Sequence, residues 1–414
     1  MTEEKYRRFR YGVQVNSLGL TEAQPENNAW RIILESLGVT LSRNARCRAL
    51  QLPAWNEAMS LPRPWDQQWS LRLQQILAYE TDLLEYPDLF DGSPVVQAKV
   101  QALMDEATAE IETILGMGGV IPAIESGYMK TALVRSMSER MSRINAGEQI
   151  VVGLNKWTEG LPSPLTAGDD GGIFKVDDKA AEEIIGHLND TRATRDSARA
   201  DAALAALKQA ARDGSNLMEP SIECALARVT TGEWGFALRE SFGEYRAPTG
   251  VSSAARNDAR CVDELRGEVD RVSRKLGRRL KFLVGKPGLD GHSNGAEQVA
   301  VRARDAGMDV VYEGIRFTPD DIVKAARDKD VHVVGLSILS GSHMPLVGEV
   351  VTKMREAGLG NVPVVVGGII PPDDEAALKE AGVAAVYTPK DFELNRIMTD
   401  IVRIVEDKAP SQAA

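Results

Sequence analysis

The residues best suited to chemistry in this sequence lie between Leu280 and Gly295, where the chain reads LKFLVGKPGLDGHSNG. The apolar run ends in Gly-Lys-Pro-Gly, which predicts a buried strand that stops abruptly and continues through a polar loop into a helix. Asp290 and His292 therefore follow the carboxyl end of a strand, the edge at which open α/β sheets bind ligands. A carboxylate two residues from an imidazole can fix the ring tautomer and leave the other nitrogen free to coordinate a metal. We therefore expect Lys286, Asp290, His292 and Gly295 to belong to a ligand site.

The composition is that of a globular protein with two or three domains. The chain has 414 residues, of which 43% are hydrophobic and 26% are charged, and both fractions are ordinary for soluble proteins. The formal net charge of -11 argues against binding to a nucleic acid backbone or an anionic membrane as the main function, because both surfaces are negatively charged.

The three cysteines, Cys47, Cys224 and Cys261, are far apart and odd in number. They indicate neither a disulfide framework nor a thiolate zinc site, so we expect a reducing cytoplasm. The segment MTEEKYRRFR has no apolar core and does not resemble a secretory signal. No apolar run approaches the roughly 20 residues that a membrane-spanning helix needs.

The first part of the chain, residues 1–160, alternates predicted strands and helices, which indicates parallel β/α units. A (β/α)8 barrel needs eight units and about 250 residues, so we predict only part of a TIM barrel here. A complete but irregular α/β domain is the alternative. The predicted strands are Tyr11–Asn16, Arg48–Pro53 and Gln149–Asn155, and the predicted helices cover about 28–42, 95–115 and 123–145, with a further helix beginning near 67.

Residues 161–277 have few strand signals and a Pro/Gly-rich start. The stretch Ser197–Asp213 has high helix propensity and ends at Gly214. We predict a helical linker whose many charges form a solvated face rather than a binding surface.

Residues 278–414 repeat a strand and a helix five times. Apolar, β-branched strands in this order predict a doubly wound, flavodoxin-like, five-stranded parallel sheet. Four loops then share the carboxyl edge of the sheet, and small residues in three of them describe a wide, shallow opening. Any one glycine pair could simply serve a tight turn, but their convergence favours a ligand. The loops are 286–295, 337–342, 367–372 and 388–391.

The other histidines are weaker candidates than His292. His187 lies in the linker and His332 opens a strand, where a structural role is the simplest interpretation. His343 lies in the loop after the third strand of the sheet, and contact with a ligand or a structural role remain equally open.

Residues 278–414 resemble cobalamin-binding domains at three motifs that occur in the same order. Asp290-Gly-His292-Ser-Asn-Gly295 matches the DxHxxG signature of these domains, Ser337-Ile-Leu339 matches their SxL element, and Gly367-Gly368 matches their GG element. The resemblance implies that His292 displaces the benzimidazole base of the cofactor and ligates cobalt, with Asp290 hydrogen-bonded to it and Lys286 in the same network. The displaced nucleotide tail would enter a cleft lined by the SxL and GG residues. The cofactor-binding residues expected on this basis are Lys286, Asp290, Gly291, His292, Gly295, Ser337, Leu339, Gly341, Gly367, Gly368 and Thr388.

The resemblance extends upstream to RYGVQVNSLGLTEAQPENN, LPAWNEAMSLPRPWDQQWSLRLQQ and IPAIESGYMK. These stretches look like the carboxyl-terminal part of the catalytic barrel of coenzyme B12-dependent acyl-CoA mutases, of the ethylmalonyl-CoA type more than the methylmalonyl-CoA type. Methylmalonyl-CoA mutases have a histidine where this chain has Gly12. By the same match Gln14 would face the thioester substrate and Glu57 the adenosyl group, although both could be ordinary polar residues at strand ends.

The resemblance implies an isomerase that uses adenosylcobalamin for a radical carbon-skeleton rearrangement, interconverting (2R)-ethylmalonyl-CoA and (2S)-methylsuccinyl-CoA. Family members carry several more β/α units before the point where this chain begins. We therefore expect a truncated chain, a fragment or a split subunit, which binds cobalamin but does not turn over substrate by itself. The implied partners are an acyl-CoA, a second copy of the chain or the missing barrel part, and a P-loop GTPase chaperone, with no nucleic acid or membrane.

Three alternatives remain. A methylmalonyl-CoA-type mutase would share nearly the whole pattern. A non-catalytic cobalamin carrier or sensor would share residues 278–414 but would lack the predicted strands Tyr11–Asn16 and Arg48–Pro53. A phospho-receiver domain has the same sheet topology but needs an aspartate at the end of the third strand, where this chain has Ser337.

Overall fold

The computed structural model describes residues 3, 9–167, 172, 174, 178–249, 251, 263–388, 391 and 393–408. The chain divides into two compact units, which we describe separately. Unit 1 comprises Met1–Lys175 together with Ala247–Ala414, and unit 2 comprises Val176–Arg246. Cys261 lies outside the described residues.

The carboxyl-terminal part of unit 1 is built on the predicted five-stranded sheet. All neighbouring strands are parallel and follow the order β4-β3-β5-β6-β7, which confirms the doubly wound topology. Because the strands are parallel, the four predicted loops do meet at one edge. The strands are β3 (Lys281–Gly285), β4 (Asp309–Val311), β5 (Val333–Ile338), β6 (Val364–Gly368) and β7 (Ala385–Tyr387).

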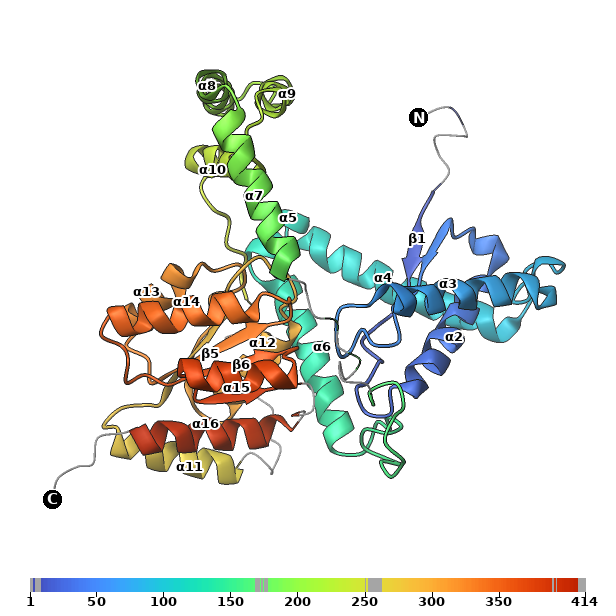
Figure 1. The fold of residues 1–414 in the computed structure, drawn as a ribbon. Helices are drawn as coiled ribbons and strands as arrows, with labels where there is room; N and C mark the ends of the chain where they lie inside the picture. Colours follow the sequence, from blue (N-terminus) through green and yellow to red (C-terminus); the bar gives the residue numbers. More distant parts are fainter. Residues whose placement is uncertain are drawn as a thin grey trace. The chain divides into compact units, whose positions relative to one another are not determined.

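Helices cover both faces of this sheet (Figure 1). Successive strand residues point to opposite faces, so Phe282 and Val284 pack into one apolar core and Leu283 packs into the other. One face is covered by α11 (Asp263–Lys275), α12 (Asn294–Asp305) and α16 (Leu394–Lys408), and the other by α13 (Pro319–Asp328), α14 (His343–Glu356) and α15 (Pro372–Ala381).

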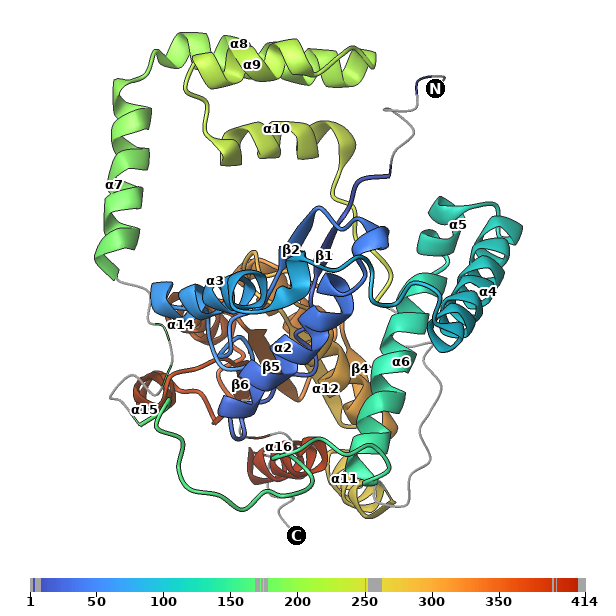
Figure 2. The same ribbon diagram turned by 90° about the vertical axis from the view of Figure 1, so that its right-hand side faces the viewer.

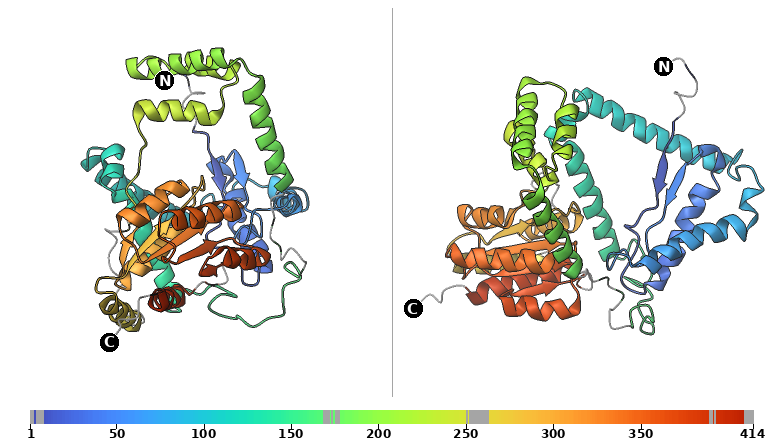
Figure 3. Two further views of the ribbon diagram at one scale, coloured as in Figure 1. Left: turned by 60° about the vertical axis from the view of Figure 1, so that its left-hand side comes forward. Right: turned by 45° about the horizontal axis from the view of Figure 1, so that its top comes forward.

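The amino-terminal part of unit 1 contains two parallel strands, seen side by side in the right-hand view of Figure 3. They are β1 (Gly12–Gln14) and β2 (Ala49–Gln51), and they confirm the first two predicted strands in shorter form. Ile32 packs beside them with Val15 and Leu52. The helices of this part are α2 (Glu26–Thr40), α3 (Pro64–Tyr79), α4 (Pro94–Gly116), α5 (Val120–Glu125) and α6 (Tyr128–Asn145), with short 3-10 turns at Arg43–Ala45 and Asp82–Leu84.

Two predictions for this part were wrong. The segment Gln149–Asn155 is not a strand, because Gly153 turns the chain with φ +81° and the Asn155 side chain bonds back to the end of α6 through the Ile144 carbonyl. The predicted helix over 123–145 is two helices, because Gly127 lies between them with φ +76°. Both failures arise where a glycine adopts a left-handed conformation inside an otherwise regular pattern.

Unit 2 consists of helices, and Figure 2 shows α8 and α9 running side by side. Ala200, Ala203 and Leu207 of α8 pack against Cys224 and Ala237 in a small core. The predicted helix Ser197–Asp213 is confirmed as α8, which starts after the Asp196 cap and ends at Gly214 with φ +69°. The other helices are α7 (Asp178–Thr194), α9 (Met218–Leu226) and α10 (Thr231–Phe242).

The division into a barrel part (1–160), a linker (161–277) and a cobalamin-binding domain (278–414) stays a prediction. Among the helices of the described ranges, none combines the length and apolarity needed to cross a bilayer.

Candidate functional site

The Asp290 carboxylate joins two loops at the carboxyl edge of the five-stranded sheet. Its Oδ1 accepts hydrogen bonds from the backbone N–H of His292 at 3.0 Å and from the His292 ring Nδ1 at 2.8 Å. Its Oδ2 accepts from Lys286 Nζ at 2.8 Å and from the Leu339 backbone N–H at 3.2 Å. The loop after β3 is thus fixed to the loop after β5, and the predicted DxH and SxL residues lie together.

Lys286 gives this network its charge balance. Its side chain is fully buried, and Nζ also donates to the Ser337 carbonyl at 3.3 Å. Burial by itself would raise the pKa of Asp290, but the hydrogen bonds from Lys286 and His292 outweigh it and hold that pKa well below its usual range. The pair is therefore a buried ammonium and carboxylate, which are stable inside a protein only because each neutralises the other.

The His292 ring is the exposed end of the network. Its side chain is 83% exposed, and Asp290 is its partner. With the ring proton on Nδ1, the Nε2 lone pair is free for a metal. Among the described residues no group of three or more His, Cys, Asp or Glu side chains could hold a metal ion. A single imidazole suits a metal that already has ring ligands, as cobalt has in a corrin.

A cavity of about 440 Å³ opens beside this network, which is within the range of ligand pockets in proteins. Two glycines in its lining leave no room for a side chain. A Cβ on Gly335 would lie 2.7 Å from the Phe282 ring, and a Cβ on Gly368, whose φ is +151°, would collide with the Ile338 carbonyl oxygen. The lining comes mostly from strand residues and the helices beside them: Phe282, Val284, Gly335, Leu336, Ser337, Leu339, Val365, Gly367, Gly368, Tyr387 and Thr388, with α12 and α16.

The Tyr387 hydroxyl supports a ligand in this cavity. Its oxygen is buried without a hydrogen-bond partner among the described residues. Burial, and then the nearby charges of Asp400 and Asp391, raise the pKa of Tyr387, so the phenol keeps its proton. A buried donor without a partner is costly, and a polar atom of a bound group would remove that cost. The cavity and the donor set therefore fit a nucleotide tail and a cobalt ligand.

The remaining predicted cofactor residues lie around the same edge. Gly291 directly precedes His292. Gly295 lies in the first turn of α12, and a Cβ on Gly295 would meet no other atom within 4 Å. Gly341 is exposed in the turn before α14. The Thr388 backbone N–H donates to Asp391 at 2.9 Å, which orders the loop after β7.

One wall of the cavity was not predicted from the sequence. Met137 and Met141 of α6 and Leu18 after β1 line it together with the sheet residues. The only signal was the spacing of Met137 and Met141, four residues apart on one helical face. Such spacing usually indicates ordinary core packing, so it could not identify a ligand wall.

Gln14 and Glu57 lie elsewhere in unit 1, at the carboxyl edge of β1 and β2. Gln14 is exposed at the end of β1, and Glu57 is half-buried in the loop after β2. Their loops are joined by the fully buried Asn28, whose Nδ2 donates to the carbonyls of Thr21 at 2.7 Å and Trp55 at 2.9 Å. Neither Gln14 nor Glu57 is hydrogen-bonded to the Asp290 network in the described part of the chain.

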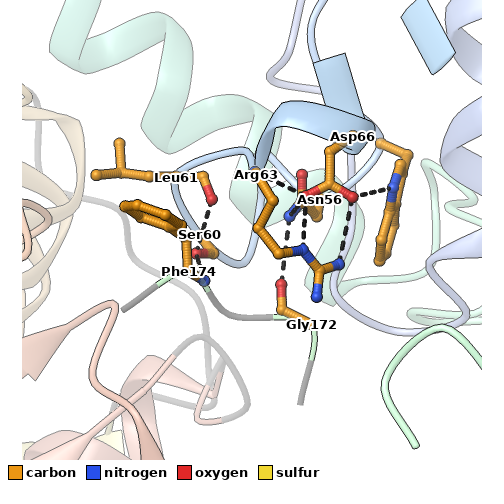
Figure 4. A network of polar contacts seen from close by, with 8 residues as sticks. Asn56, Ser60, Leu61, Arg63, Asp66, Gly172 and Phe174 are labelled. Carbon is orange, nitrogen blue, oxygen red and sulfur yellow. Dashed lines mark hydrogen bonds and ion pairs between the residues drawn. The ribbon is translucent and has the colours of Figure 1, made fainter. Parts of the chain in front are cut away.

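Asp66 holds the Glu57 loop from the other side (Figure 4). Its fully buried carboxylate accepts from Trp55 Nε1 and Asn56 Nδ2, both at 2.9 Å, and forms an ion pair with Arg63 Nε at 2.9 Å. The two residues preceding Glu57 are therefore fixed by buried hydrogen bonds, while the Glu57 carboxylate has no bonding partner within the described ranges. The sequence did not single out Asn28 or Asp66.

His187 is exposed on α7, and the other two histidines have structural partners. The prediction that His343 lies in a loop was wrong, because His343 is the first residue of α14. Its ring is buried there, and its Nε2 lies 2.8 Å from an Asp374 oxygen. The His332 ring Nδ1 accepts from the Lys281 backbone N–H at 2.8 Å, and burial lowers the His332 pKa. Each ring thus joins two elements of the sheet domain, and His343 Nδ1 is buried without a hydrogen-bond partner among the described residues.

The sheet, the Asp290–His292 pair and the adjoining cavity define a cobalamin-binding domain. Residues 280–393 match the family model described as B12 binding domain, and residues 1–244 match the model described as methylmalonyl-CoA mutase. The chain belongs to the methylmalonyl-CoA mutase family.

Relatives of known name agree with this assignment. The chain is 63% identical over 407 residues to a protein of Cereibacter sphaeroides named ethylmalonyl-CoA mutase, covering 98% of this chain and 62% of that one. A protein of the same name from Methylorubrum extorquens is 59% identical, with 100% and 60% covered. The methylmalonyl-CoA mutase of Cereibacter sphaeroides is 33% identical, with 92% and 53% covered. The chain thus spans about three fifths of the length of these two ethylmalonyl-CoA mutases.

Among solved structures, a cobalamin-binding protein from Desulfitobacterium hafniense aligns at a TM-score of 0.28 and 19% identity, covering 49% of this chain and 98% of that chain. A likeness this low adds nothing to the assignment.

Proposed function

We propose that this chain is the cobalamin-binding part of an adenosylcobalamin-dependent mutase that interconverts (2R)-ethylmalonyl-CoA and (2S)-methylsuccinyl-CoA. The observation that carries the proposal is the His292 ring, held by Asp290 through Nδ1 and exposed at Nε2 beside an apolar cavity. The substrate rests on similarity, because identity is 63% and 59% to the two proteins named ethylmalonyl-CoA mutase but 33% to a methylmalonyl-CoA mutase.

Adenosylcobalamin, when bound, supplies the organic radical that starts a carbon-skeleton rearrangement. In this proposal His292 would ligate the cobalt through Nε2, and Asp290 keeps the ring proton on Nδ1. Lys286 keeps Asp290 ionised, so the carboxylate remains a hydrogen-bond acceptor for the ring. The cavity takes the nucleotide tail, and its apolar walls exclude water from it.

Gln14 and Glu57 would act at the other side of the cofactor. We propose that Gln14 contacts the thioester and that Glu57 contacts the adenosyl group. The buried anchors Asn28 and Asp66 support this role for Glu57, since they fix its loop and leave its carboxylate available.

Electron spin resonance with cob(II)alamin tests the axial ligand. Protein carrying ¹⁵N-histidine should change the nitrogen splitting of the bound cobalt from a triplet to a doublet, because ¹⁵N has spin one half. His292→Ala should abolish this isotope effect. An isotope effect that survives His292→Ala would refute the assignment.

The substrate is tested with the whole protein by comparing ethylmalonyl-CoA with methylmalonyl-CoA. One methylene in a fitted pocket discriminates by about 10- to 200-fold in kcat/KM. A methylmalonyl-CoA-type mutase is the second candidate, and Gly12, in place of the histidine of those enzymes, favours the larger substrate. Equal or faster turnover of methylmalonyl-CoA would select the second candidate.

Partners and location are also proposed. An acyl-CoA is the substrate, and a homodimer, a separately supplied barrel part and a P-loop GTPase chaperone are the assembly partners that family resemblance suggests. The free thiols of Cys47 and Cys224 favour a reducing cytoplasm.

A further inference from the structure

Helix α6, from the amino-terminal half of the chain, packs along α12 of the cobalamin-binding domain. Val134 of α6 is 1% exposed and belongs to the same apolar core as Ala296 and Ala300 of α12. Met137 and Met141 continue this face of α6 into the cavity. The spacing of these residues places them on one side of the helix, so α6 is part of the domain that would hold the cofactor.

Lys130 lies one turn before Val134 and contacts the start of α12 at two points. Its Nζ is 2.6 Å from Glu297 Oε1 and donates to Ser293 Oγ at 3.2 Å. Ser293 is the residue directly after His292, and Glu297 lies in the first turn of α12. Lys130 therefore spans the point at which the His292 loop becomes a helix.

The contact with Glu297 is a strong one. The Glu297 side chain is 4% exposed, and that of Lys130 is 28% exposed. A buried carboxylate without a cation is strongly unfavourable, so Glu297 holds the Lys130 ammonium in place. The same ammonium then restrains Ser293, and through the backbone it restrains His292.

The His292 loop is consequently fixed at both ends. Asp290 bonds the ring and the backbone N–H of His292 on the amino-terminal side, and Lys130 bonds Ser293 on the other side. The ring itself is otherwise exposed. With Lys130 removed, the Ser293 side chain would lose its bond to α6 and keep the backbone bond that its carbonyl accepts from Glu297 at 3.0 Å. The loop after His292 would then be held less firmly, and the ring could leave the position that Nε2 needs for the metal.

We propose that Lys130 is a positioning residue for His292, which ties the cobalt-ligand loop to helix α6 of the mutase region. The proposal rests on the proposed function, because it takes His292 as the axial ligand. Lys130 touches neither the metal nor the substrate in this role. It acts through Ser293 and Glu297.

The test uses Lys130→Met and the exchanged pair Lys130→Glu with Glu297→Lys. Two quantities are measured: the dissociation constant for hydroxocobalamin, and the fraction of bound cob(II)alamin that shows the ¹⁵N-histidine splitting. Lys130→Met should lower the ligated fraction and weaken binding about 10-fold, the lower end for loss of a group that supports a metal ligand. The exchanged pair should restore much of both. Lys353→Met is the matched control, since it breaks a lysine ion pair with Asp320 on the other face of the same sheet, and it should change neither quantity.

Each outcome has one meaning. A Lys130→Met protein that melts earlier but keeps its full ligated fraction and affinity overturns the proposal, because Lys130 is then only structural. If Lys130→Met does not fold, the exchanged pair decides: a folded exchanged pair that lacks histidine ligation also overturns it. Absence of the isotope effect in the unmodified protein refutes the axial-ligand assignment instead, and with it the proposed function.

Discussion

The buried pair of Lys286 and Asp290 offers the sharpest quantitative test of the site. Asp290→Ala leaves the Lys286 ammonium, which is fully buried, with the Ser337 carbonyl at 3.3 Å as its one remaining partner in the described part of the chain. Removing one partner of a buried ion pair costs about 3–5 kcal/mol. Lys286→Met should cost less, about 1–3 kcal/mol, because Asp290 keeps the donors from His292 and Leu339.

The double variant Lys286→Met with Asp290→Ala removes both charges together. We expect it to be no less stable than Asp290→Ala by itself, which corresponds to a coupling energy at least equal to the cost of Lys286→Met, about 1–3 kcal/mol. Because the chain has two units and cannot be treated as a single two-state system, the measurement is the free energy of opening from hydrogen exchange at the β5 amides.

The matched control is the exposed pair of Lys353 and Asp320, whose side chains are 28% and 76% exposed. The same cycle there should give a coupling of about 0–1 kcal/mol. Additive losses at Lys286 and Asp290, or a loss below about 1 kcal/mol for Asp290→Ala, would refute the claim that the two charges neutralise each other in a buried site.

The same pair sets an acid limit. The pKa of Asp290 is lowered in the folded protein, while an unfolded aspartate has a pKa of about 3.9. The contribution of Asp290 is therefore complete above about pH 4 and is lost as the pH falls towards its folded pKa. Between about pH 5 and 7 Asp290 stays ionised in both the folded and the unfolded chain. Hydrogen exchange at the β5 amides, corrected for intrinsic exchange rates, should therefore not depend on Asp290 in that range.

Three further predictions concern other parts of the chain. Gly368→Ala should lower the melting temperature by the equivalent of more than about 1 kcal/mol, because its φ is +151° and a Cβ would strike a β5 carbonyl. The control Gly367→Ala, whose Cβ has no neighbour closer than 3.9 Å, should lower it much less. Equal losses in the two variants would contradict this reasoning. Asp66→Ala should destabilise the region of β1 and β2 by about 3–5 kcal/mol, seen as faster hydrogen exchange in α3, and an unchanged exchange rate would count against the anchor. The hydrogen bond from Arg195 lowers the pKa of Glu233 to about 2, so unit 2 should lose stability only as the pH falls from about 4.3 towards 2; Glu233→Gln should flatten that dependence, and an unaltered pH profile of α8 exchange would exclude it.

The five-stranded sheet could be predicted because each strand is an apolar run that ends at a small or polar residue. The strand–helix repeat makes the strands parallel, which brings Asp290, Ser337 and Gly367 to one edge. Element ends were less predictable, since they depend on single backbone conformations such as that of Gly127. The false strand at 149–155 has the right composition, but the structure gives it only an isolated bridge between Val152 and Lys156, and an apolar run without a neighbouring strand has no ladder to join.

The contacts that position the site were not predictable in the same way. Lys130 and Glu297 are separated by more than a hundred residues, and each by itself is an ordinary charged residue on a helix. Their burial appears only when α6 packs on α12. Asn28 was likewise not predictable as an anchor, because its contact with the Glu57 loop forms only once β1 and β2 lie side by side.

His292 and Glu57, two residues predicted to contact a ligand, have side chains with few contacts on a backbone that is firmly held. The His292 ring is 83% exposed, and the Glu57 carboxylate bonds no other residue that the structure describes, whereas the residues beside them, such as Ser293 and Asn56, are bonded. This arrangement fixes the backbone that carries a reactive group and keeps one face of the group open, which is what a preorganised site requires. It also limits what a motif can transfer. Placing DxHxxG on another flavodoxin-like sheet would supply the imidazole without the buried lysine and the helix that hold it, so such a graft should bind cobalamin weakly and show little histidine ligation.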